Sequence, residues 1–217
     1  INEASKKIVA VQNIQNGYVR PFAWRGSEQM GVSAQKTKTN VAIATWEWPA
    51  YFDPKLKAEG IKLNISKWRR PAPNTIPWDA KAAGLYMICT LSKHEAEQQG
   101  FSESLMLDFE GNVAEGTSAN IFFKDKNNDL HTPIADSFLN GITRQAVIEL
   151  AKSKSLKVYE RKISPEELNN FEGSFLTGTA AEITPVASIA DHKYRVCDVI
   201  LGLSKSFDEL VRQKKAA

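Results

Sequence analysis

Apolar residues follow two periods along the chain, and these periods predict an ordered series of helices and strands. Residues 1–15 carry a one-sided stripe of Ile and Val near helical spacing, which predicts a first helix. Residues 17–25 and 40–48 are rich in Val, Ile, Trp, Tyr and Phe, which predicts two strands. One helix and two strands cannot bury their apolar faces alone, so residues 1–48 are too little for an independent domain.

A proline-containing connection follows these elements. The segment 49–60 contains Pro49 and Pro54 and has no sustained period, which is typical of a connection between domains. We therefore place an interdomain linker at residues 49–57 and a large C-terminal domain at residues 58–217.

The large C-terminal region alternates strands with helices. Its patterns predict strands at residues 61–68, 105–109, 113–114, 120–123, 158–163 and 173–177, and helices at residues 79–99, 143–154, 164–170 and 199–213. Asp79 is the expected N-cap of the first of these helices. Tight turns such as Glu110-Gly111-Asn112 predict hairpins, so the expected fold class is α+β with a mixed sheet rather than a doubly wound sheet.

Composition and charge exclude several classes of protein. The chain has 217 residues, of which 42% are hydrophobic, and this fits a globular protein with a sizeable core. Its net charge is only +3, and Lys and Arg are interleaved with Asp and Glu, so we expect no nucleic-acid partner. No apolar run is long enough to span a bilayer, and the first residues are too charged for a signal peptide, so we expect neither a membrane segment nor secretion.

The cysteines and histidines give no metal-binding pattern. Cys89 and Cys197 lie far apart, which indicates two buried thiols and a reducing, cytoplasmic compartment. His94, His131 and His192 share no short spacing with each other or with a cysteine, so we expect no metal site.

Three features are candidates for chemistry. Lys81 lies near the start of the helix expected from Asp79, where the helix dipole would favour a free amine that can bond to a carbonyl carbon. The turns Gly141-Ile142-Thr143 and Gly178-Thr179-Ala180 offer N–H groups and hydroxyls to a dianion. Glu115 lies among small residues and would suit a pyridinium partner. The alternatives are a solvated lysine, plain helix caps or bends, and a carboxylate that faces water.

Four ordered runs make the pattern more specific. The sequence resembles the class IV pyridoxal-phosphate-dependent aminotransferases in consecutive blocks, namely Ala80 to Tyr86, Val113 to Phe122, Leu139 to Arg144 and Gly178 to Val186. Together with Tyr18-Val19-Arg20-Pro21, these runs resemble the branched-chain amino-acid members more than the D-amino-acid aminotransferases or the aminodeoxychorismate lyases. The resemblance covers nearly all of the chain.

The resemblance implies a fold and an activity. The fold would be the two-domain α+β fold of D-amino-acid aminotransferase type, with residues 1–48 as a remnant of a mostly absent small N-terminal domain. The activity would be transamination of leucine, isoleucine and valine with 2-oxoglutarate, by a homodimer or a higher homo-oligomer. Another class IV activity, on D-amino acids or (R)-amines, and a non-catalytic fragment are the alternatives.

The resemblance also implies residue roles. Lys81 would hold the cofactor covalently and carry the substrate proton, Tyr86 would bind the cofactor's phenolic oxygen, and Glu115 would keep the pyridine nitrogen protonated. The remaining cofactor contacts would come from Gly141, Ile142, Thr143 and Thr179, and the substrate contacts from Tyr18, Arg20, Thr179 and Ala180. Leu85 and Ser118-Ala119 depart from the commoner residues of the family, and its phosphate-binding arginine would lie upstream of Ile1.

Overall fold

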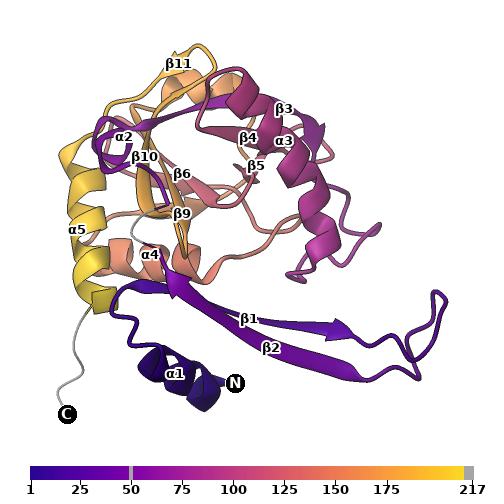
Figure 1. Ribbon diagram of the computed structural model, residues 1–217. Coiled ribbons are helices and arrows are strands. Elements are labelled where there is room, and N and C mark those ends of the chain that lie inside the picture. The colour runs from indigo at the N-terminus through magenta and orange to yellow at the C-terminus, as the bar shows by residue number, and fades with distance from the viewer. Residues whose placement is uncertain (49–50, 213–217) are drawn as a thin grey trace. The chain divides into compact units, whose positions relative to one another are not determined.

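The computed structural model describes residues 1–48 and 51–212, and their contacts divide the chain into two compact units (Figure 1). The units are Ile1–Tyr51 and Phe52–Ala217. This division falls inside the predicted linker, of which residues 49 and 50 lie outside the described residues. The assignment of residues 1–48 to a domain remnant, 49–57 to a linker and 58–217 to the large domain stays a prediction.

The first unit is a helix and a two-stranded ribbon. Helix α1 (Asn2–Val11) precedes the antiparallel strands β1 (Gly17–Arg25) and β2 (Thr39–Glu47), in which Gly17 pairs with Glu47 and Arg25 with Thr39. The predicted strands are confirmed within one residue. The predicted helix was too long because Asn13 has φ 51°, a left-handed conformation that an α-helix does not contain.

The second unit is built on a mixed sheet of nine strands within the described residues, in the order β5-β4-β3-β10-β9-β6-β7-β8, with β11 paired to β10. The pairs β3/β4, β3/β10 and β7/β8 are parallel and the others antiparallel, which confirms the α+β prediction. The strands are β3 (Ile61–Arg69), β4 (Glu103–Leu107), β5 (Val113–Gly116), β6 (Asn120–Lys124), β7 (Leu130–Thr132), β8 (Val158–Glu160), β9 (Gly173–Gly178), β10 (Glu182–Ile189) and β11 (His192–Lys193).

Helices connect and cover this sheet. They are α2 (Pro54–Glu59), the 3-10 turn η1 (Ala83–Tyr86), α3 (Met87–Gln98), α4 (Ile142–Ser153), the 3-10 turn η2 (Pro165–Asn170) and α5 (Asp198–Arg212). Helix α3 lies between β3 and β4 in the chain, and α4 between β7 and β8, because parallel neighbours need a crossover connection. Turn η2 begins with a capping box formed by Ser164 and Glu167.

The helix expected over residues 79–99 begins later than predicted, and Asp79 is not its N-cap. The N–H of Ala80 donates to the carbonyl of Pro77 at 3.0 Å, which closes a turn around Asp79. Ala82 then has an extended backbone, with φ −89° and ψ 136°, so the helical hydrogen bonds cannot start before η1. Lys81 therefore lies ahead of the helix and not in its first turn.

Other differences concern short elements. Helix α2 forms inside the segment predicted to be irregular, because the Asp53 carboxylate caps it by accepting from the N–H of Lys55 at 2.8 Å. Strands β7, β10 and β11 were not predicted, and β8 ends three residues earlier than expected. The closing helix is confirmed through Arg212, while its predicted last residue, 213, lies outside the described residues.

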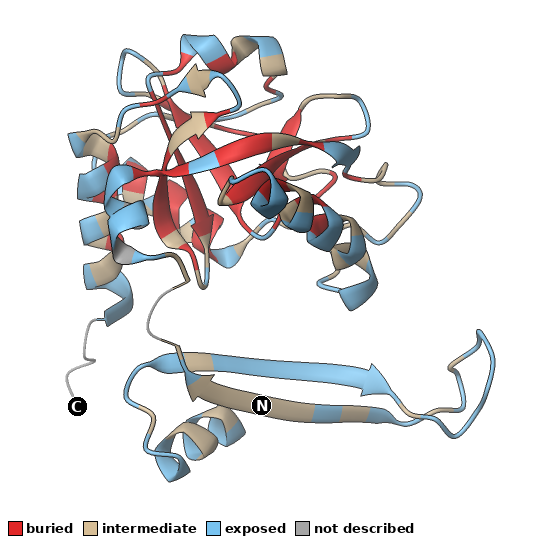
Figure 2. Cartoon of the chain, turned by 45° about the horizontal axis from the view of Figure 1, so that its top comes forward, coloured by how far each residue is buried: buried red, intermediate tan, exposed pale blue. Residues whose placement is uncertain are grey.

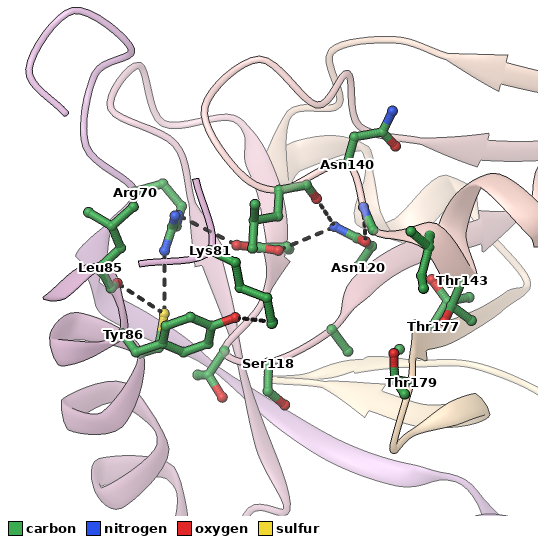
Figure 3. Close-up of a pocket in the computed structure, with 18 of the residues that line it drawn as sticks. Arg70, Lys81, Leu85, Tyr86, Ser118, Asn120, Asn140, Thr143, Thr177 and Thr179 are labelled. Atoms are coloured by element: carbon green, nitrogen blue, oxygen red, sulfur yellow. Dashed lines mark hydrogen bonds and ion pairs between the residues drawn. The ribbon is translucent and has the colours of Figure 1, made fainter. Parts of the chain in front are cut away.

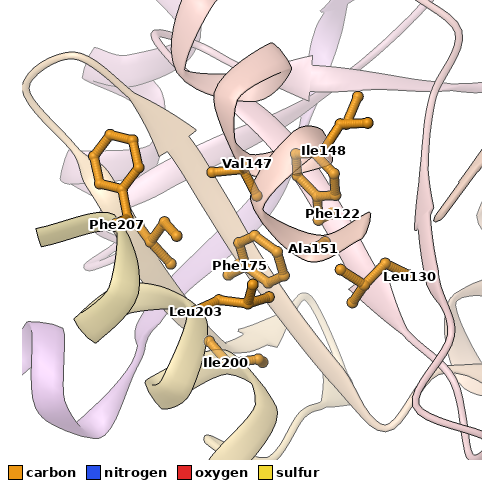
Figure 4. Close-up of a cluster of buried hydrophobic side chains, with 10 residues drawn as sticks. Phe122, Leu130, Val147, Ile148, Ala151, Phe175, Ile200, Leu203 and Phe207 are labelled. Atoms are coloured by element: carbon orange, nitrogen blue, oxygen red, sulfur yellow. The ribbon is translucent and has the colours of Figure 1, made fainter. Parts of the chain in front are cut away.

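A buried apolar cluster fixes α4 and α5 on the sheet (Figure 4). The Phe122 and Phe175 rings stack with their centres 5.0 Å apart, and α4 and α5 pack around them. Figure 2 shows that the buried residues concentrate in the strands of this unit. The cluster contains Phe122, Leu130, Val147, Ile148, Ala151, Phe175, Ile183, Ile200, Leu203 and Phe207.

We expect Leu203→Ala to lower the free energy of unfolding by about 2–5 kcal/mol, because the side chain is 1% exposed and its removal leaves a cavity. The matched control is Leu201→Ala on the same helix, whose side chain is 46% exposed and should change stability by about 0.5 kcal/mol or less. Urea denaturation of both variants measures the difference. Equal losses would show that α5 does not pack as described.

Candidate active site

A cavity of about 300 Å³ opens in the second unit, where several loops meet (Figure 3). Its walls come from the segment before η1, the turn between β5 and β6, the start of α4 and the end of β9. All seven residues that the sequence assigns to a cofactor line it, namely Lys81, Tyr86, Glu115, Gly141, Ile142, Thr143 and Thr179. Their individual roles stay predictions.

The amine of Lys81 is held by a tyrosine. Its Nζ donates a hydrogen bond of 2.5 Å to the hydroxyl of Tyr86 and lies 5.0 Å from the centre of that ring. No ion pair within the described part of the chain involves Lys81. Because Lys81 precedes the helix, the helix dipole does not account for its position, and that part of the sequence interpretation is wrong. The turn η1 places Tyr86 against the amine instead.

Glu115 is a buried carboxyl at the end of β5. Its Oε2 accepts from the side-chain amide of Asn120 at 3.2 Å, and its Oε1 lies 3.5 Å from Nε of Arg70. Burial raises the pKa of Glu115 to about 8, although the positive charges of Arg70 and Lys81 lower it. A cation placed at this carboxyl would favour its ionised form, so the site suits a protonated ring nitrogen.

Asn120 connects this carboxyl to the start of α4. Its Nδ2 also donates to the carbonyl of Leu139 at 2.9 Å, and its Oδ1 accepts the N–H of Gly141 at 3.2 Å. A Cβ at Gly141 would lie 2.4 Å from Asn120 Oδ1, so a larger residue there would displace the Asn120 amide. From the sequence, Gly141 and its N–H were expected to contact a ligand. In the structure the close contact at Gly141 is with Oδ1 of Asn120.

Beside this contact, backbone N–H groups at the start of α4 are available to bind an anion. Helix α4 starts at Ile142, so the N–H groups of Ile142 and Thr143 have no acceptor inside the helix. The second turn follows β9. Its Thr179 lines the cavity, while the next residue, Ala180, is not among the lining residues. Both turns lie at the cavity, and their expected role as a dianion site stays a prediction.

Two buried atoms point to a polar ligand in the same cavity. Oγ1 of Thr177 is buried and has no hydrogen-bond partner among the described residues, and buried Nε of Arg70 has none there besides its 3.5 Å ion pair with Glu115. Both side chains line the cavity. Buried polar atoms normally have partners, so these atoms are suited to groups that a ligand supplies. The cavity thus offers an amine, a carboxyl that needs a cation, and donors for a dianion.

Sequence reasoning missed Arg70, Asn120 and Thr177. Arg70 lies in a proline-punctuated run with no periodic pattern, and its Nη1 lies 3.4 Å from Sγ of Cys89. Burial raises the pKa of Cys89 to about 11, so this thiol stays neutral. Both cysteines are free, as expected, although Cys197 is only half-buried.

Tyr18 and Arg20 lie in the first unit, on the same face of β1. The Arg20 guanidinium carbon lies 5.6 Å from the centre of the Tyr18 ring and 5.7 Å from that of Trp46. Such cation–π contacts hold the guanidinium in place while its N–H groups remain able to donate to a carboxylate. The substrate-binding roles of both residues stay predictions.

The described residues, 1–48 and 51–212, contain neither a membrane-spanning helix nor a cluster of metal ligands. None of the helices there is long and apolar enough to cross a membrane. Those residues also contain no group of three or more His, Cys, Asp or Glu side chains that could hold a metal ion.

The chain is similar to aminotransferases in sequence. The family model described as "Amino-transferase class IV" matches residues 1–189. The "Probable branched-chain-amino-acid aminotransferase" of Rickettsia bellii (strain RML369-C) is 40% identical over 98% of this chain and 73% of the relative. The "Branched-chain-amino-acid aminotransferase" of Pseudomonas aeruginosa is 38% identical over 100% of this chain and 71% of the relative.

The fold is similar to that of a solved enzyme. The crystal structure of a "Branched-Chain Amino Acid Aminotransferase with Pyridoxamine 5'-phosphate", from the organism abbreviated T.th., matches 96% of this chain and 70% of that chain, with a TM-score of 0.91 and 35% identity. This chain therefore spans about seven tenths of the length of these proteins.

The pKa of Glu115 predicts a pH-dependent stability. Between about 4.5, its ordinary value, and about 8, the folded protein binds a proton at Glu115 that the unfolded chain has lost, so stability falls as pH rises. Glu115→Gln is neutral at every pH and lacks this dependence. We expect the cofactor-free wild type to lose unfolding free energy relative to Glu115→Gln across this range. Urea denaturation at several pH values measures the difference, and a difference that stays constant would contradict the expectation.

Proposed function

We propose, since the chain belongs to the class IV aminotransferases, that it transfers amino groups between branched-chain L-amino acids (leucine, isoleucine and valine) and 2-oxoglutarate. The protein is an aminotransferase of the branched-chain type, and its cofactor is pyridoxal 5'-phosphate. One observation carries the proposal for this chain. A single cavity holds the Lys81 amine, the buried Glu115 carboxyl and two anion-binding turns.

The residues of this cavity fit the cofactor. When bound, pyridoxal phosphate supplies an electron sink that makes the Cα proton of an amino acid acidic. Lys81 holds the cofactor through its Nζ and then carries the proton that leaves Cα. Tyr86 contacts Lys81 Nζ directly, which supports a role for its hydroxyl in orienting the amine; the same hydroxyl would bind the phenolic oxygen of the cofactor.

Two groups of residues hold the two ends of the cofactor. Glu115 would hold the ring nitrogen and keep it protonated, because a buried carboxylate favours a cationic partner. Ile142 and Thr143 at the start of α4 and Thr179 at the β9 turn line the cavity and would hold the phosphate.

The substrate is bound by its carboxylates. In the second unit the backbone at Thr179 and Ala180 is the predicted contact of the α-carboxylate. In the first unit Tyr18 and Arg20 keep their predicted role as contacts of the distal carboxylate of glutamate or 2-oxoglutarate. We further propose that the protein is a homodimer or a higher homo-oligomer.

The two free cysteines support a cytoplasmic location, since reducing compartments keep thiols unpaired.

We predict that borohydride reduction of the protein with pyridoxal phosphate attaches the cofactor covalently to Lys81. Peptide mass spectrometry locates the label, and Lys81→Arg should take up none. The control is Lys93→Arg, because that lysine lies on α3 and does not line the cavity. A label on another lysine, or full activity in Lys81→Arg, would refute the assignment.

Specificity gives a further prediction, tested with a panel of amino-acid substrates. Leucine, isoleucine, valine and glutamate should all be substrates, and Arg20→Ala should lower kcat/KM for glutamate by roughly tenfold or more while changing that for leucine less. Arg25→Ala on the same strand is the control.

Other results with the panel of amino-acid substrates would point to the alternative functions. Turnover of D-amino acids or (R)-amines in place of L-amino acids would favour another class IV activity, and no turnover at all would favour a non-catalytic fragment. Equal losses for glutamate and leucine in Arg20→Ala would give Arg20 a structural role.

A further inference from the structure

A second glutamate, Glu103, is fully buried beside the cavity and has no part in the chemistry described above. It lies on β4 and is 0% exposed, yet none of the ion pairs among the described residues involves it. It is not one of the residues that line the cavity. Burying a carboxyl without a cation is costly, so its retention in the core needs another reason.

The carboxyl of Glu103 accepts hydrogen bonds from the turn between β5 and β6. Oε1 accepts from the N–H of Ser104 at 2.9 Å, from the N–H of Thr117 at 3.3 Å and, in a short contact, from the hydroxyl of Thr117. Oε2 accepts from the hydroxyl of Ser118 at 3.3 Å. A carboxylate can accept all four, and three of the donors belong to the turn.

This turn separates the two residues that set up the cavity. Glu115 is two residues before Thr117, and Asn120 is two residues after Ser118. Within the turn the N–H of Gly116 donates to the carbonyl of Ala119 at 2.7 Å. A shift of the turn would therefore change the 3.2 Å contact between Asn120 and Glu115, and with it the 3.2 Å contact between Asn120 and Gly141.

We propose that Glu103 is a positioning residue, whose buried carboxylate holds the β5–β6 turn and thereby keeps Glu115 and the start of α4 at the spacing that the cofactor requires. The effect on cofactor binding rests on the proposed function. The hydrogen bonds by which Glu103 fixes the turn do not depend on it. The charged groups around Glu115 are Arg70, Lys81 and Glu103, and the negative charge of Glu103 raises the pKa of Glu115.

Three variants of the full chain separate hydrogen bonding from charge. Glu103→Gln keeps an acceptor for Ser104 and Thr117, and its amide can donate to the Ser118 hydroxyl, so only the charge is lost. Glu103→Ala leaves buried donors without an acceptor. Glu110→Ala is the matched control, since Glu110 is an exposed glutamate of the β4–β5 turn that pairs with Lys162.

Two measurements test the effect of these substitutions on the cavity. The first is the Kd for pyridoxal phosphate, from absorbance titration, which should rise by roughly tenfold or more in Glu103→Ala and by less than about threefold in Glu103→Gln and Glu110→Ala. The second is the pH midpoint of Glu115 in the cofactor-free protein, from the infrared carboxylate band that Glu115→Gln abolishes. It should fall in Glu103→Gln, because a negative charge has been removed, and stay unchanged in Glu110→Ala.

Either of two results would overturn the proposal: wild-type affinity in Glu103→Ala, or an unchanged Glu115 midpoint in Glu103→Gln. If Glu103→Ala does not fold, Thr117→Val takes its place, because it removes one donor from the turn and should raise the Kd by about threefold or more. Should the wild type itself not bind the cofactor, the proposed function fails. Hydrogen–deuterium exchange of the Thr117 backbone N–H would still test whether Glu103 fixes the turn, and it should be faster in Glu103→Ala than in the wild type.

Discussion

The side-chain amide of Asn120 joins the two ends of the cavity, and the arrangement of the other residues depends on it. Its Nδ2 contacts the carboxyl of Glu115, and its Oδ1 accepts the N–H of Gly141, where α4 is about to begin. The absence of a Cβ at Gly141 permits this approach. A cofactor with a ring nitrogen and a phosphate would have to meet both ends at once. The one amide of Asn120 would then fix the distance between Glu115, the proposed partner of the nitrogen, and the start of α4, the proposed partner of the phosphate.

The sheet brings these groups together from distant parts of the chain. Asn120 of β6 is paired with Thr177 of β9, so the β5–β6 turn lies beside the turn that follows β9. The stacked rings of Phe122 and Phe175 lie two residues further along the same two strands and hold α4 against them. The apolar core thus determines where the polar cavity residues lie. The cost of burying Glu115 and Glu103 is offset by that packing and by the hydrogen bonds that each carboxyl accepts.

Much of this could be predicted from the sequence, because strand periodicity and turn residues are local. Lys81, Tyr86, Glu115, Gly141, Ile142, Thr143 and Thr179 were predicted as cofactor residues, and the structure gathers all of them around one cavity. The helix over residues 79–99 began too early, because a turn closed on Pro77 and the extended Ala82 precede it. Arg70 and Glu103 were missed, since their importance comes from contacts with Glu115 and Thr117, which are distant in the sequence, and no local pattern reports such contacts.

We propose that Glu115, the start of α4 and the β9 turn form one preorganised site for pyridoxal phosphate. A crystal structure of the protein grown with this cofactor tests it most directly. We expect the ring nitrogen within hydrogen-bond distance of the Glu115 carboxyl and the phosphate at the N–H groups of Ile142, Thr143 and Thr179. Asn120 should still bridge Glu115 and Gly141. A ring nitrogen that does not meet Glu115, or a phosphate bound away from the start of α4, would contradict it.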